Sequence, residues 1–443
     1  MKRVAIIGGG ISGLSAAWEL KKKQIPFIIF EAAECCGGAI RTIHEAGCLI
    51  EAGPNSLSGP QPELDRLIHA LDLEGDICPA DSHASNRFIV RDGQPIALPR
   101  SFAEYIKTPL FSATAKWRLL KEPFIRSASF PGETLAAFAE RRLGREPLTY
   151  ALNPFVSGIY AGDPDRLSAA AAFPMLIEME REHGSLLKAL IHRSKKQRIS
   201  GNPRSPRTIY TFKEGMQMLP NRIVKKIGSD AIKTLHPIEA VAALPSGEWN
   251  VAGDLFSDLL LTLPTHAQSK LGTPFDLTFL HAVRYPSVTS LSLLYERNQL
   301  THPLNGFGML IPACEDRFIL GVLFPSSIFA NRAPENSVLL TVFIGGDRQP
   351  DRALLPMDQL LPSVEKDLHE LLGLQGAPHH ISTHRWEDAI PQYTQEIETV
   401  HEQLATLEAA HSGLYFAGNY RDGISITNAI TSGRTVAERI IDK

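Results

Sequence analysis

The two ends of the chain carry strand and helix patterns typical of one parallel-sheet unit. A short β-branched run at residues 3–7 predicts a strand, and the next apolar residues recur at helical spacing. Residues 27–30 predict a second strand. Near the other end, residues 414–419 predict a buried strand that runs into a loop, and residues 427–441 predict a helix. We therefore expect both ends of the chain to form parts of one domain.

The middle of the chain changes character twice. From residue 101 to about residue 199 the pattern is mostly helical, with frequent prolines, which predicts a helical insertion. Strand patterns return after residue 207. They cover residues 208–212, 231–235, 259–263, 288–295, 318–324 and 338–344, and the last three predict a second sheet.

Composition and charge exclude several classes of protein. The 443 residues suggest about three structural units. With 44% hydrophobic and 21% charged residues the chain is of the folded globular type, and its net charge of −3 gives no general attraction to nucleic acid. The five cysteines form no C-x-x-C pair, so we expect neither a disulfide framework nor a metal site, and a reducing, cytoplasmic location. No apolar run approaches the roughly 20 residues of a membrane-spanning helix.

The turn after the first predicted strand has the pattern Gly8-x-Gly10-x-x-Gly13. Glycines at this spacing let the chain turn tightly and bring backbone N–H groups and a helix N-terminus against a pyrophosphate. A chance glycine turn is the alternative. However, Glu31 ends the next strand, where an acidic side chain accepts hydrogen bonds from an adenosine ribose. The pattern predicts a dinucleotide site, and Glu31 favours FAD or NAD over NADP.

Further motifs distinguish FAD from NAD. Residues 37–42 and 51–55 resemble the extended fingerprint of the flavin amine oxidase superfamily, which NAD dehydrogenases lack. Residues 416–419 and 423–426 resemble the C-terminal flavin motif of that superfamily. A helix that starts there would direct its positive end at the flavin, where negative charge collects on reduction. A surface ion pair is the alternative interpretation of Arg41, and a turn before a terminal helix is the alternative for the C-terminal glycines.

A narrower resemblance runs through nearly the whole chain. Five ordered blocks resemble the protoporphyrinogen oxidase family, at residues 86–88, 154–164, 306–310, 329–334 and 344–346. The resemblance implies an oxygen-dependent FAD enzyme that removes six electrons from protoporphyrinogen IX and forms protoporphyrin IX in haem biosynthesis. A coproporphyrinogen III oxidase, an amine oxidase and a carotenoid desaturase remain alternatives. A non-catalytic flavin-binding scaffold is the alternative outside enzymes.

The chemistry of a porphyrinogen agrees with what the sequence lacks. We find no nucleophile with a base partner and no G-x-S-x-G motif, so no residue is identified as an acid or base. The bridging CH2 groups of a porphyrinogen lie between electron-rich pyrroles, so loss of hydride gives a delocalised cation that sheds an N–H proton. Orientation against the flavin and a pocket for a flat tetrapyrrole would supply most of the catalysis.

The resemblance also implies site residues. Arg87 would bind a substrate propionate, Leu310 and Leu323 would lie on either side of the macrocycle, and Phe343 against a further pyrrole. Core packing is the alternative for the apolar residues, and a solvated strand-edge charge for Arg87. The implied substrate residues are Arg87, Gly158, Ala161, Leu310, Leu323 and Phe343. The FAD residues are Gly8, Gly10, Ser12, Gly13, Glu31, Ala32, Gly38, Arg41, Gly53, Pro54, Asn55, Ser56, Ile238, Gly418, Asn419, Ile424, Ser425 and Ile426.

The fold class that we expect is α/β. It comprises a Rossmann-like FAD-binding domain of the GR2 type, a mixed-sheet substrate domain and a helical insertion. The FAD-binding domain would be discontinuous. Its parts are residues 1–85, 206–270 and 381–443, with the insertion at residues 86–205 and the substrate domain at residues 271–380.

The expected partners are a porphyrinogen, O2, a membrane surface and the next enzyme of the haem pathway, and not nucleic acid. The apolar stretch 167–177 and the segment 188–213, which holds eight Lys and Arg and no acidic residue, would bind the inner face of the cell membrane. A solvated loop is the alternative. We expect FAD to be bound without a covalent bond, because no cysteine follows Cys314.

The substrate choice depends on charge. Residues 56–62 contain no Lys or Arg, and Arg87 is the one charged member of the implied substrate residues. Burying an unpaired carboxylate is costly. The sequence therefore favours protoporphyrinogen, with two propionates, over coproporphyrinogen, with four.

Overall fold

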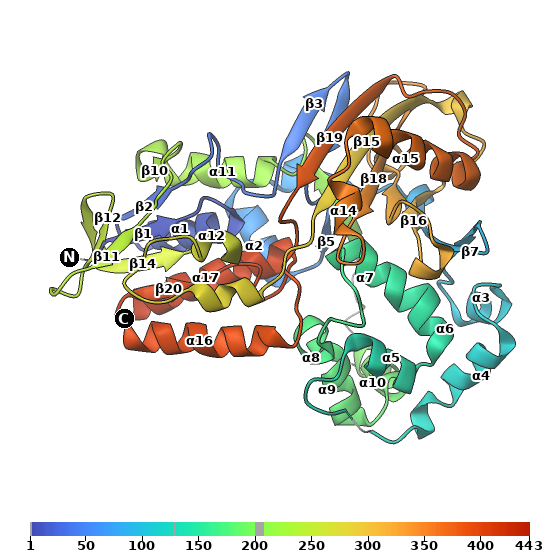
Figure 1. Cartoon of the computed structure of the whole chain (residues 1–443), viewed down its shortest axis with the longest axis horizontal. Helices are drawn as coiled ribbons and strands as arrows, with labels where there is room; N and C mark the ends of the chain where they lie inside the picture. Colours follow the sequence, from blue (N-terminus) through green and yellow to red (C-terminus); the bar gives the residue numbers. More distant parts are fainter. Residues whose placement is uncertain (1, 128, 200–207) are drawn as a thin grey trace.

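The computed structural model describes residues 2–127, 129–199 and 208–443, with side chains up to residue 195 in the last helix before the second gap. Figure 1 shows two lobes. One holds a parallel sheet and both termini, and the other holds a larger sheet above a group of helices. The expected α/β class, with a mixed second sheet and a helical insertion, is confirmed.

The first lobe is built on a five-stranded parallel sheet in the order β10-β2-β1-β14-β20. Its strands are β1 (Val4–Ile7), β2 (Phe27–Phe30), β10 (Ile232–Lys233), β14 (Asp258–Leu261) and β20 (Leu414–Phe416). Helices α1 (Ile11–Lys22) and α17 (Ile426–Asp442) pack so closely that a Cβ on Gly433 would lie 2.0 Å from the carbonyl oxygen of Ser12. The two ends of the chain therefore form one sheet and one core, as the sequence predicts.

The second lobe is built on a mixed seven-stranded sheet in the order β19-β15-β18-β17-β16-β7-β8. Its strands are β7 (Asn86–Arg91), β8 (Gln94–Ala97), β15 (Val288–Glu296), β16 (Gly306–Leu310), β17 (Gly321–Leu323), β18 (Ser337–Gly345) and β19 (His380–Trp386). Strands β16 and β7 are parallel and the other pairs antiparallel. Helix α15 (Met357–Leu372) packs against the sheet and shares its core.

Several details differ from the sequence prediction, and two of them concern the seven-stranded sheet. Residues 318–324 form a strand only from Gly321, because the amides of Phe318 and Ile319 donate to the Asp367 carboxylate, at 2.7 and 3.1 Å, instead of to a strand. Residues 86–97, which the predicted domain division places in the helical insertion, form β7 and β8 of the large sheet. The domain division itself stays a prediction.

The helices of the insertion lie at the lower right of Figure 1. They are α3 (Phe102–Lys107), α4 (Ala113–Leu120), α5 (Leu135–Arg142), α6 (Arg145–Pro147), α7 (Asn153–Tyr160), α8 (Ala169–Ala172), α9 (Pro174–His183) and α10 (Leu186–Ile199), with a 3-10 turn η3 (Glu122–Phe124) and a π-turn η4 (Leu148–Leu152). In the part of the chain that the structure describes, no helix has the length and apolar character needed to cross a membrane.

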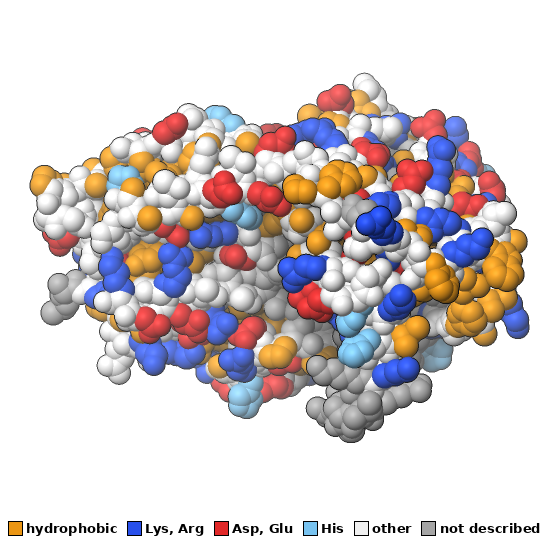
Figure 2. All heavy atoms as spheres, turned by 90° about the horizontal axis from the view of Figure 1, so that it is seen from below, with side chains coloured by type: hydrophobic (Ala, Val, Ile, Leu, Met, Phe, Trp, Pro, Cys, Tyr) orange, Lys and Arg blue, Asp and Glu red, His pale blue; other side chains and the backbone are white. Residues whose placement is uncertain are grey.

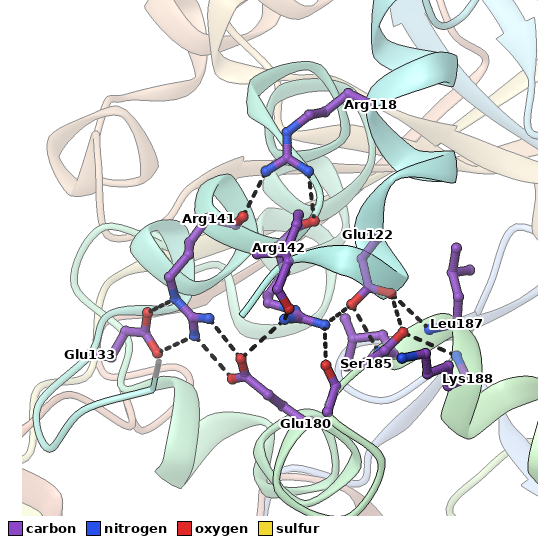
Figure 3. Close-up of polar contacts among 12 residues, drawn as sticks. Arg118, Glu122, Glu133, Arg141, Arg142, Glu180, Ser185, Leu187 and Lys188 are labelled. Carbon is purple, nitrogen blue, oxygen red and sulfur yellow. Dashed lines mark hydrogen bonds and ion pairs between the residues drawn. The ribbon is translucent and has the colours of Figure 1, made fainter. Parts of the chain in front are cut away.

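A buried network of charges holds these helices together (Figure 3). The Arg142 guanidinium, at 0% exposure, pairs with Glu122 of η3 and lies 3.4 Å from Glu180 of α9. Arg141 binds Glu180 and Glu133 at 2.7 and 2.8 Å. Burial raises the pKa of Glu122, but hydrogen bonds from Ser185 and the following backbone amides outweigh it and hold that pKa below its ordinary value. Removing one partner of such a network leaves a buried charge uncompensated.

Smaller elements complete the fold. One two-stranded sheet pairs β3 (Thr42–Glu45) with β4 (Cys48–Glu51). A three-stranded sheet has the order β5 (Leu57–Gly59), β9 (Thr208–Phe212) and β6 (Ile77–Pro79). A second three-stranded sheet has the order β11 (Val241–Ala243), β12 (Trp249–Val251) and β13 (Asp254–Phe256). The helices are α2 (Pro62–Ala70), α11 (Met218–Ile227), α12 (Thr265–Gln268), α13 (Pro325–Ile328), α14 (Pro350–Ala353) and α16 (Glu396–Ala410). The remaining 3-10 turns are η1 (Glu74–Asp76), η2 (Ser82–Ser85), η5 (Ser229–Ala231), η6 (Thr278–Ala282), η7 (Arg297–Gln299) and η8 (Ala313–Glu315).

Candidate active site

The glycine-rich turn lies between β1 and α1. Gly8 has a φ of +109°, and a Cβ on Gly13 would lie 2.1 Å from the Gly8 carbonyl oxygen, so both positions need glycine. In front of Gly10 the space is open, because a Cβ there would meet no atom within 4 Å. No side chain caps the N-terminus of α1. The free amides and the open space form a cradle that fits a pyrophosphate.

Glu31 closes this cradle at the end of β2. Its carboxylate accepts hydrogen bonds from the amides of Gly9 at 2.6 Å and Ala33 at 2.8 Å. Ala32 is exposed beside it. Arg41 is exposed and donates to the carbonyl of Gly38 at 3.2 Å, and no carboxylate pairs with it among the described residues. Glu31 is thus held at the mouth of the glycine turn, where it can reach a ribose.

A cavity of about 430 Å³ lies between the residues after β4, the loop before α17 and the seven-stranded sheet. The structure brings most of the predicted ring-binding and substrate residues to it. Those that line it are Gly53, Pro54, Asn55, Ser56, Gly158, Ala161, Leu310, Leu323, Phe343, Asn419 and Ile424. None of the described residues that line the cavity carries a charge. The cavity suits a large apolar ligand.

The substrate side of the cavity is formed by neighbouring strands and by α7. Leu310, Leu323 and Phe343 come from β16, β17 and β18, which pair in register, and all three are half-buried. Helix α7 ends at Tyr160, and the next residue, Ala161, has a left-handed φ of +48°. Gly158 lies against Leu310. The placement agrees with a pocket wall rather than with fully buried core.

Arg87 does not line the cavity. It is exposed on β7, with its guanidinium 5.3 Å from the centre of the Phe307 ring, and Phe307 does line the cavity. Among the described residues no ion pair with a carboxylate is found for Arg87, and its guanidinium contacts the Phe307 ring. Arg87 therefore stands at the rim, behind one aromatic side chain.

Other predicted cofactor residues lie outside the cavity. Gly418 donates its amide to the Ser432 hydroxyl at 3.0 Å, and Ser425 caps α17 by accepting from the Asn428 amide. Ile426 is the first residue of α17. Ile238 packs against the buried core that includes Ile7 and Phe30 of the parallel sheet. Ser12 is buried in the first turn of α1.

Sequence reasoning missed part of the lining. Trp386, at the end of β19, lines the cavity and donates its indole N–H to the Ala52 carbonyl at 2.9 Å. His384 lies against it, with ring centres 4.3 Å apart, and burial together with the charge of Arg41 lowers the pKa of His384. A tryptophan that ends a strand of polar, half-exposed residues was the available signal. The other residues missed are Ala39, Ala52, Ser157, Ile159, Val288, Ser290, Phe307, Met309, Leu320, Val322, Ala389 and Ile390.

Charged groups lie just outside the cavity, beside Ala161. The buried Asp347 pairs with Arg284 at 2.8 Å, and its amide donates to the Ala161 carbonyl at 2.7 Å. Burial raises the pKa of Asp347. Arg348 pairs with Asp163 at 3.0 Å. Because each carboxylate has an arginine partner, this cluster fixes the end of α7 and leaves the cavity apolar.

The described residues contain no group of three or more His, Cys, Asp or Glu side chains placed to hold a metal ion. No nucleophile with a base partner lies in the cavity lining. The cavity has room for a flat apolar molecule between the seven-stranded sheet and the lining residues 53–56, 419 and 424.

Comparison with known proteins extends over the whole chain. The family model described as flavin containing amine oxidoreductase matches residues 11–441. The chain is 31% identical to protoporphyrinogen oxidase 2, chloroplastic/mitochondrial, of Arabidopsis thaliana, over 99% of this chain and 94% of the relative. It is 29% identical to the protoporphyrinogen oxidase of Bos taurus, over 99% and 98% of the two chains.

Solved structures support the fold. A crystal structure provisionally assigned as a protoporphyrinogen oxidase from Exiguobacterium sp. 255-15 superimposes with a TM-score of 0.84 at 23% identity, covering 100% of this chain and 99% of that one. Wild-type putrescine oxidase bound to putrescine superimposes with a TM-score of 0.69 at 15% identity, covering 100% and 99%. At these identities the likeness concerns the fold alone.

Proposed function

The chain belongs to the flavin-containing amine oxidoreductase family, and from this premise we propose that it is an FAD-dependent protoporphyrinogen oxidase. The reaction removes six electrons from protoporphyrinogen IX in three two-electron steps. Each step transfers a hydride from the carbon skeleton and releases an N–H proton, and one O2 is reduced to H2O2 each time. The products are protoporphyrin IX and three H2O2.

The observation that carries the proposal is the uncharged cavity next to the flavin segments. An amine substrate that enters as a cation would benefit from a carboxylate, and the described lining of the cavity contains none. A tetrapyrrole presents two flat apolar faces, which suit Leu310, Leu323 and Phe343. The full-length similarity to relatives named protoporphyrinogen oxidase supports the same choice.

The residues fit FAD. The open space before Gly10 and the uncapped α1 would hold the pyrophosphate, and Glu31 the ribose. Residues 53–56 and Asn419 and Ile424 would hold the flavin ring. Bound FAD supplies the hydride acceptor. The positive end of α17 begins next to Ile424 and favours negative charge on the ring.

The protein's own contribution to catalysis is orientation in a site that excludes water. The substrate needs no base on the enzyme, because the cation left by hydride loss is acidic at its own N–H. Holding a reacting carbon at contact distance from the acceptor converts a collision into an intramolecular event, which is worth up to about 7–11 kcal/mol in ideal cases. The apolar walls from β16, β17 and β18 serve this purpose.

We assign a propionate of the substrate to Arg87. The guanidinium is exposed at the rim of the cavity and has no acidic partner among the described residues, so it is free to form a bidentate pair with a carboxylate. In this proposal the propionates face solvent and the vinyl edges lie inside the cavity. Two propionates fit this arrangement, whereas four would place carboxylates against the uncharged walls.

We also propose that the protein contacts a membrane surface. In the part of the chain that the structure describes, eleven of the fourteen exposed large hydrophobic side chains lie between residues 102 and 191. Trp117 is 67% exposed and Phe124 88% exposed. Figure 2 shows hydrophobic side chains gathered at the right end of its view, where α3 and α4 lie in Figure 1. An apolar patch of this kind is typical of an interaction site.

The surface that we propose differs from the predicted one. The stretch 167–177 does not reach solvent as a unit, because Leu167 and Ala169 are fully buried in the core. The described basic side chains Lys188, Arg193 and Lys195 lie on α10, whereas residues 200–207 of the predicted basic segment lie outside the described residues. Ile159 belongs both to the exposed apolar set and to the cavity lining, which favours entry of an apolar substrate from lipid. Contact with the enzyme that consumes the porphyrin would compete for the same face.

The test of the activity is direct. Purified holoprotein is mixed with protoporphyrinogen and, separately, with coproporphyrinogen, and porphyrin fluorescence and H2O2 are followed. We expect porphyrin from protoporphyrinogen with three H2O2 for each porphyrin and the higher kcat/KM for this substrate. A higher kcat/KM for coproporphyrinogen would show that coproporphyrinogen, and not protoporphyrinogen, is the preferred substrate. A flavin that stays oxidised with both substrates under anaerobic conditions would refute the activity.

A further inference from the structure

Tyr393 joins the loop before α17 to the wall of the cavity. Its hydroxyl donates to the Asn419 carbonyl at 2.7 Å and accepts from the Gly423 amide at 2.7 Å. Asn419 and the neighbour of Gly423, Ile424, both line the cavity. The hydroxyl oxygen of Tyr393 therefore binds the loop at Asn419 and at Gly423, next to the two loop residues that line the cavity.

The segment that carries Tyr393 is itself part of the site. Ala389 and Ile390 line the cavity, and Gln392 donates to the Tyr160 carbonyl at 2.8 Å, at the end of α7. The carbonyl of Tyr393 accepts from the Ser168 amide at 2.8 Å. Residues 389–393 thus contact the insertion, the cavity and the loop before α17.

Burial makes this bridge rigid. Tyr393 is 4% exposed, its ring lies 6.5 Å from the Tyr160 ring, and its hydroxyl is both donor and acceptor. Desolvation raises the pKa of Tyr393 far above its ordinary value, so the hydroxyl stays neutral and keeps its proton for Asn419. Tyr393 does not line the cavity, so it acts through the loop.

We propose that Tyr393 is a positioning residue, which fixes the loop 419–424 against the cavity and so sets the flavin ring relative to the substrate. This inference rests on the proposed flavin function, because it concerns the residues that would hold the ring. Other contacts also anchor the loop, such as the His401 ring nitrogen and the Tyr420 carbonyl, 3.0 Å apart. These contacts do not involve the carbonyl of Asn419 or the amide of Gly423.

The experiment compares Tyr393→Phe with Tyr160→Phe. Both changes remove one buried hydroxyl that makes a hydrogen bond, since the Tyr160 hydroxyl donates to the Ala172 carbonyl at 3.0 Å inside the insertion. The dissociation constant of FAD is measured by flavin fluorescence on reconstitution of the apoprotein. The rate of anaerobic flavin reduction by protoporphyrinogen and the KM are measured on the holoenzyme.

For Tyr393→Phe we expect the FAD dissociation constant to rise about tenfold, equivalent to about 1.4 kcal/mol. We also expect the reduction rate to fall about tenfold with KM unchanged within about twofold, as for an interaction that serves orientation. Tyr160→Phe should lower the melting temperature but leave FAD affinity and reduction rate unchanged. Equal effects of the two variants, or wild-type FAD affinity in Tyr393→Phe, would overturn the inference. FAD affinity is measured without porphyrinogen, so its outcome is separate from a failure of the proposed substrate.

Discussion

A Cβ atom on Gly158 would lie 2.5 Å from Cδ2 of Leu310, across the contact between α7 and β16. The atom in the way is the end of a flexible side chain that also lines the cavity. Leu310 can yield by turning, and the cavity that it lines offers open space for this movement. The absence of a side chain at Gly158 therefore keeps the cavity wide.

Gly158→Ala should narrow the cavity without unfolding the protein. An added methyl group in a packed contact costs roughly 1–3 kcal/mol, and here we expect the cost to appear as a rise of roughly tenfold in KM for the porphyrinogen. Leu310→Val in the same chain should restore KM, because it removes the colliding methyl. Gly75→Ala is the control, since a Cβ there meets nothing within 4 Å. A KM for Gly158→Ala equal to that of Gly75→Ala would show that the missing side chain at Gly158 does not keep the cavity wide.

Arg87→Ala should weaken substrate binding and leave the flavin untouched. A hydrogen bond to a charged group contributes about 1.5–3 kcal/mol, so KM should rise at least about tenfold. The KM of Arg87→Lys should lie between those of wild type and Arg87→Ala. The visible spectrum of the flavin should be unchanged, because Arg87 lies behind Phe307 at the rim. Arg66→Ala, on the distant α2, serves as the matched control for a lost surface arginine. If Arg87→Ala has the KM of this control, Arg87 does not bind a propionate.

The local pattern of the sequence predicts nine of the twenty strands in the described residues, and it leaves part of the site undetected. Strands β2 and β9 have the predicted bounds, because short apolar runs between turn residues admit few alternatives. Trp386 was missed because its partner Ala52 is more than 300 positions away, and pairing between the lobes leaves no periodic signal.

The apolar stretch 167–177 shows the opposite error. An apolar run fits both a membrane contact and a protein core, and periodicity alone does not separate the two. Here Leu167 is buried, its carbonyl accepts from Leu135, and the residue forms a β-bridge with Thr394. These partners are distant in sequence, so only the fold decides which surface is exposed.

FAD should be released by denaturation. The described cysteines are free, and none of the five lines the cavity, so no thiol stands where a flavin ring could be linked. Precipitation with acid or heat should give a yellow supernatant and a colourless pellet. The absorbance at the flavin maximum, measured in both fractions, checks this. A yellow pellet that keeps its colour after washing in denaturant would indicate a covalent bond.

Glu122→Gln should destabilise the insertion in a pH-dependent way. The carboxylate is fully buried and accepts from Arg142, Ser185 and the Leu186 amide, so its loss breaks an ion pair and leaves buried donors without their acceptor. Glu180 remains 3.4 Å from Arg142, and we expect a cost of about 3–5 kcal/mol at pH 7. The pKa of Glu122 in the folded protein lies below its ordinary value of 4.5. The contribution of the ion pair is therefore complete above the ordinary value and is lost as pH falls through the folded pKa, so the two proteins should converge in acid.

Urea unfolding at pH 7 and at a series of pH values descending below 4.5 measures this difference. Glu140→Gln is the matched control, because Glu140 lies exposed on the same helix as Arg142 and should change the unfolding midpoint little at any of these pH values. A gap between Glu122→Gln and wild type that stays constant with pH would show that packing, and not the charge of Glu122, holds the helices together.

The exposed apolar face of the insertion should bind lipid. Trp117 and Phe124 offer large aromatic side chains next to Lys121, so both apolar burial and attraction to anionic headgroups contribute. Wild-type holoprotein should float with vesicles that contain anionic lipid, and binding should weaken with salt, because each basic residue adds about 1 kcal/mol near such a surface.

The double variant Trp117→Ser and Phe124→Ser should float several-fold less. The exposed leucines Leu235 and Leu354 lie outside the insertion, and their replacement by Ser is the control. The double variant should keep its kcat in detergent solution, because neither Trp117 nor Phe124 lines the cavity. Equal flotation of the two double variants would assign the exposed face to some contact other than lipid.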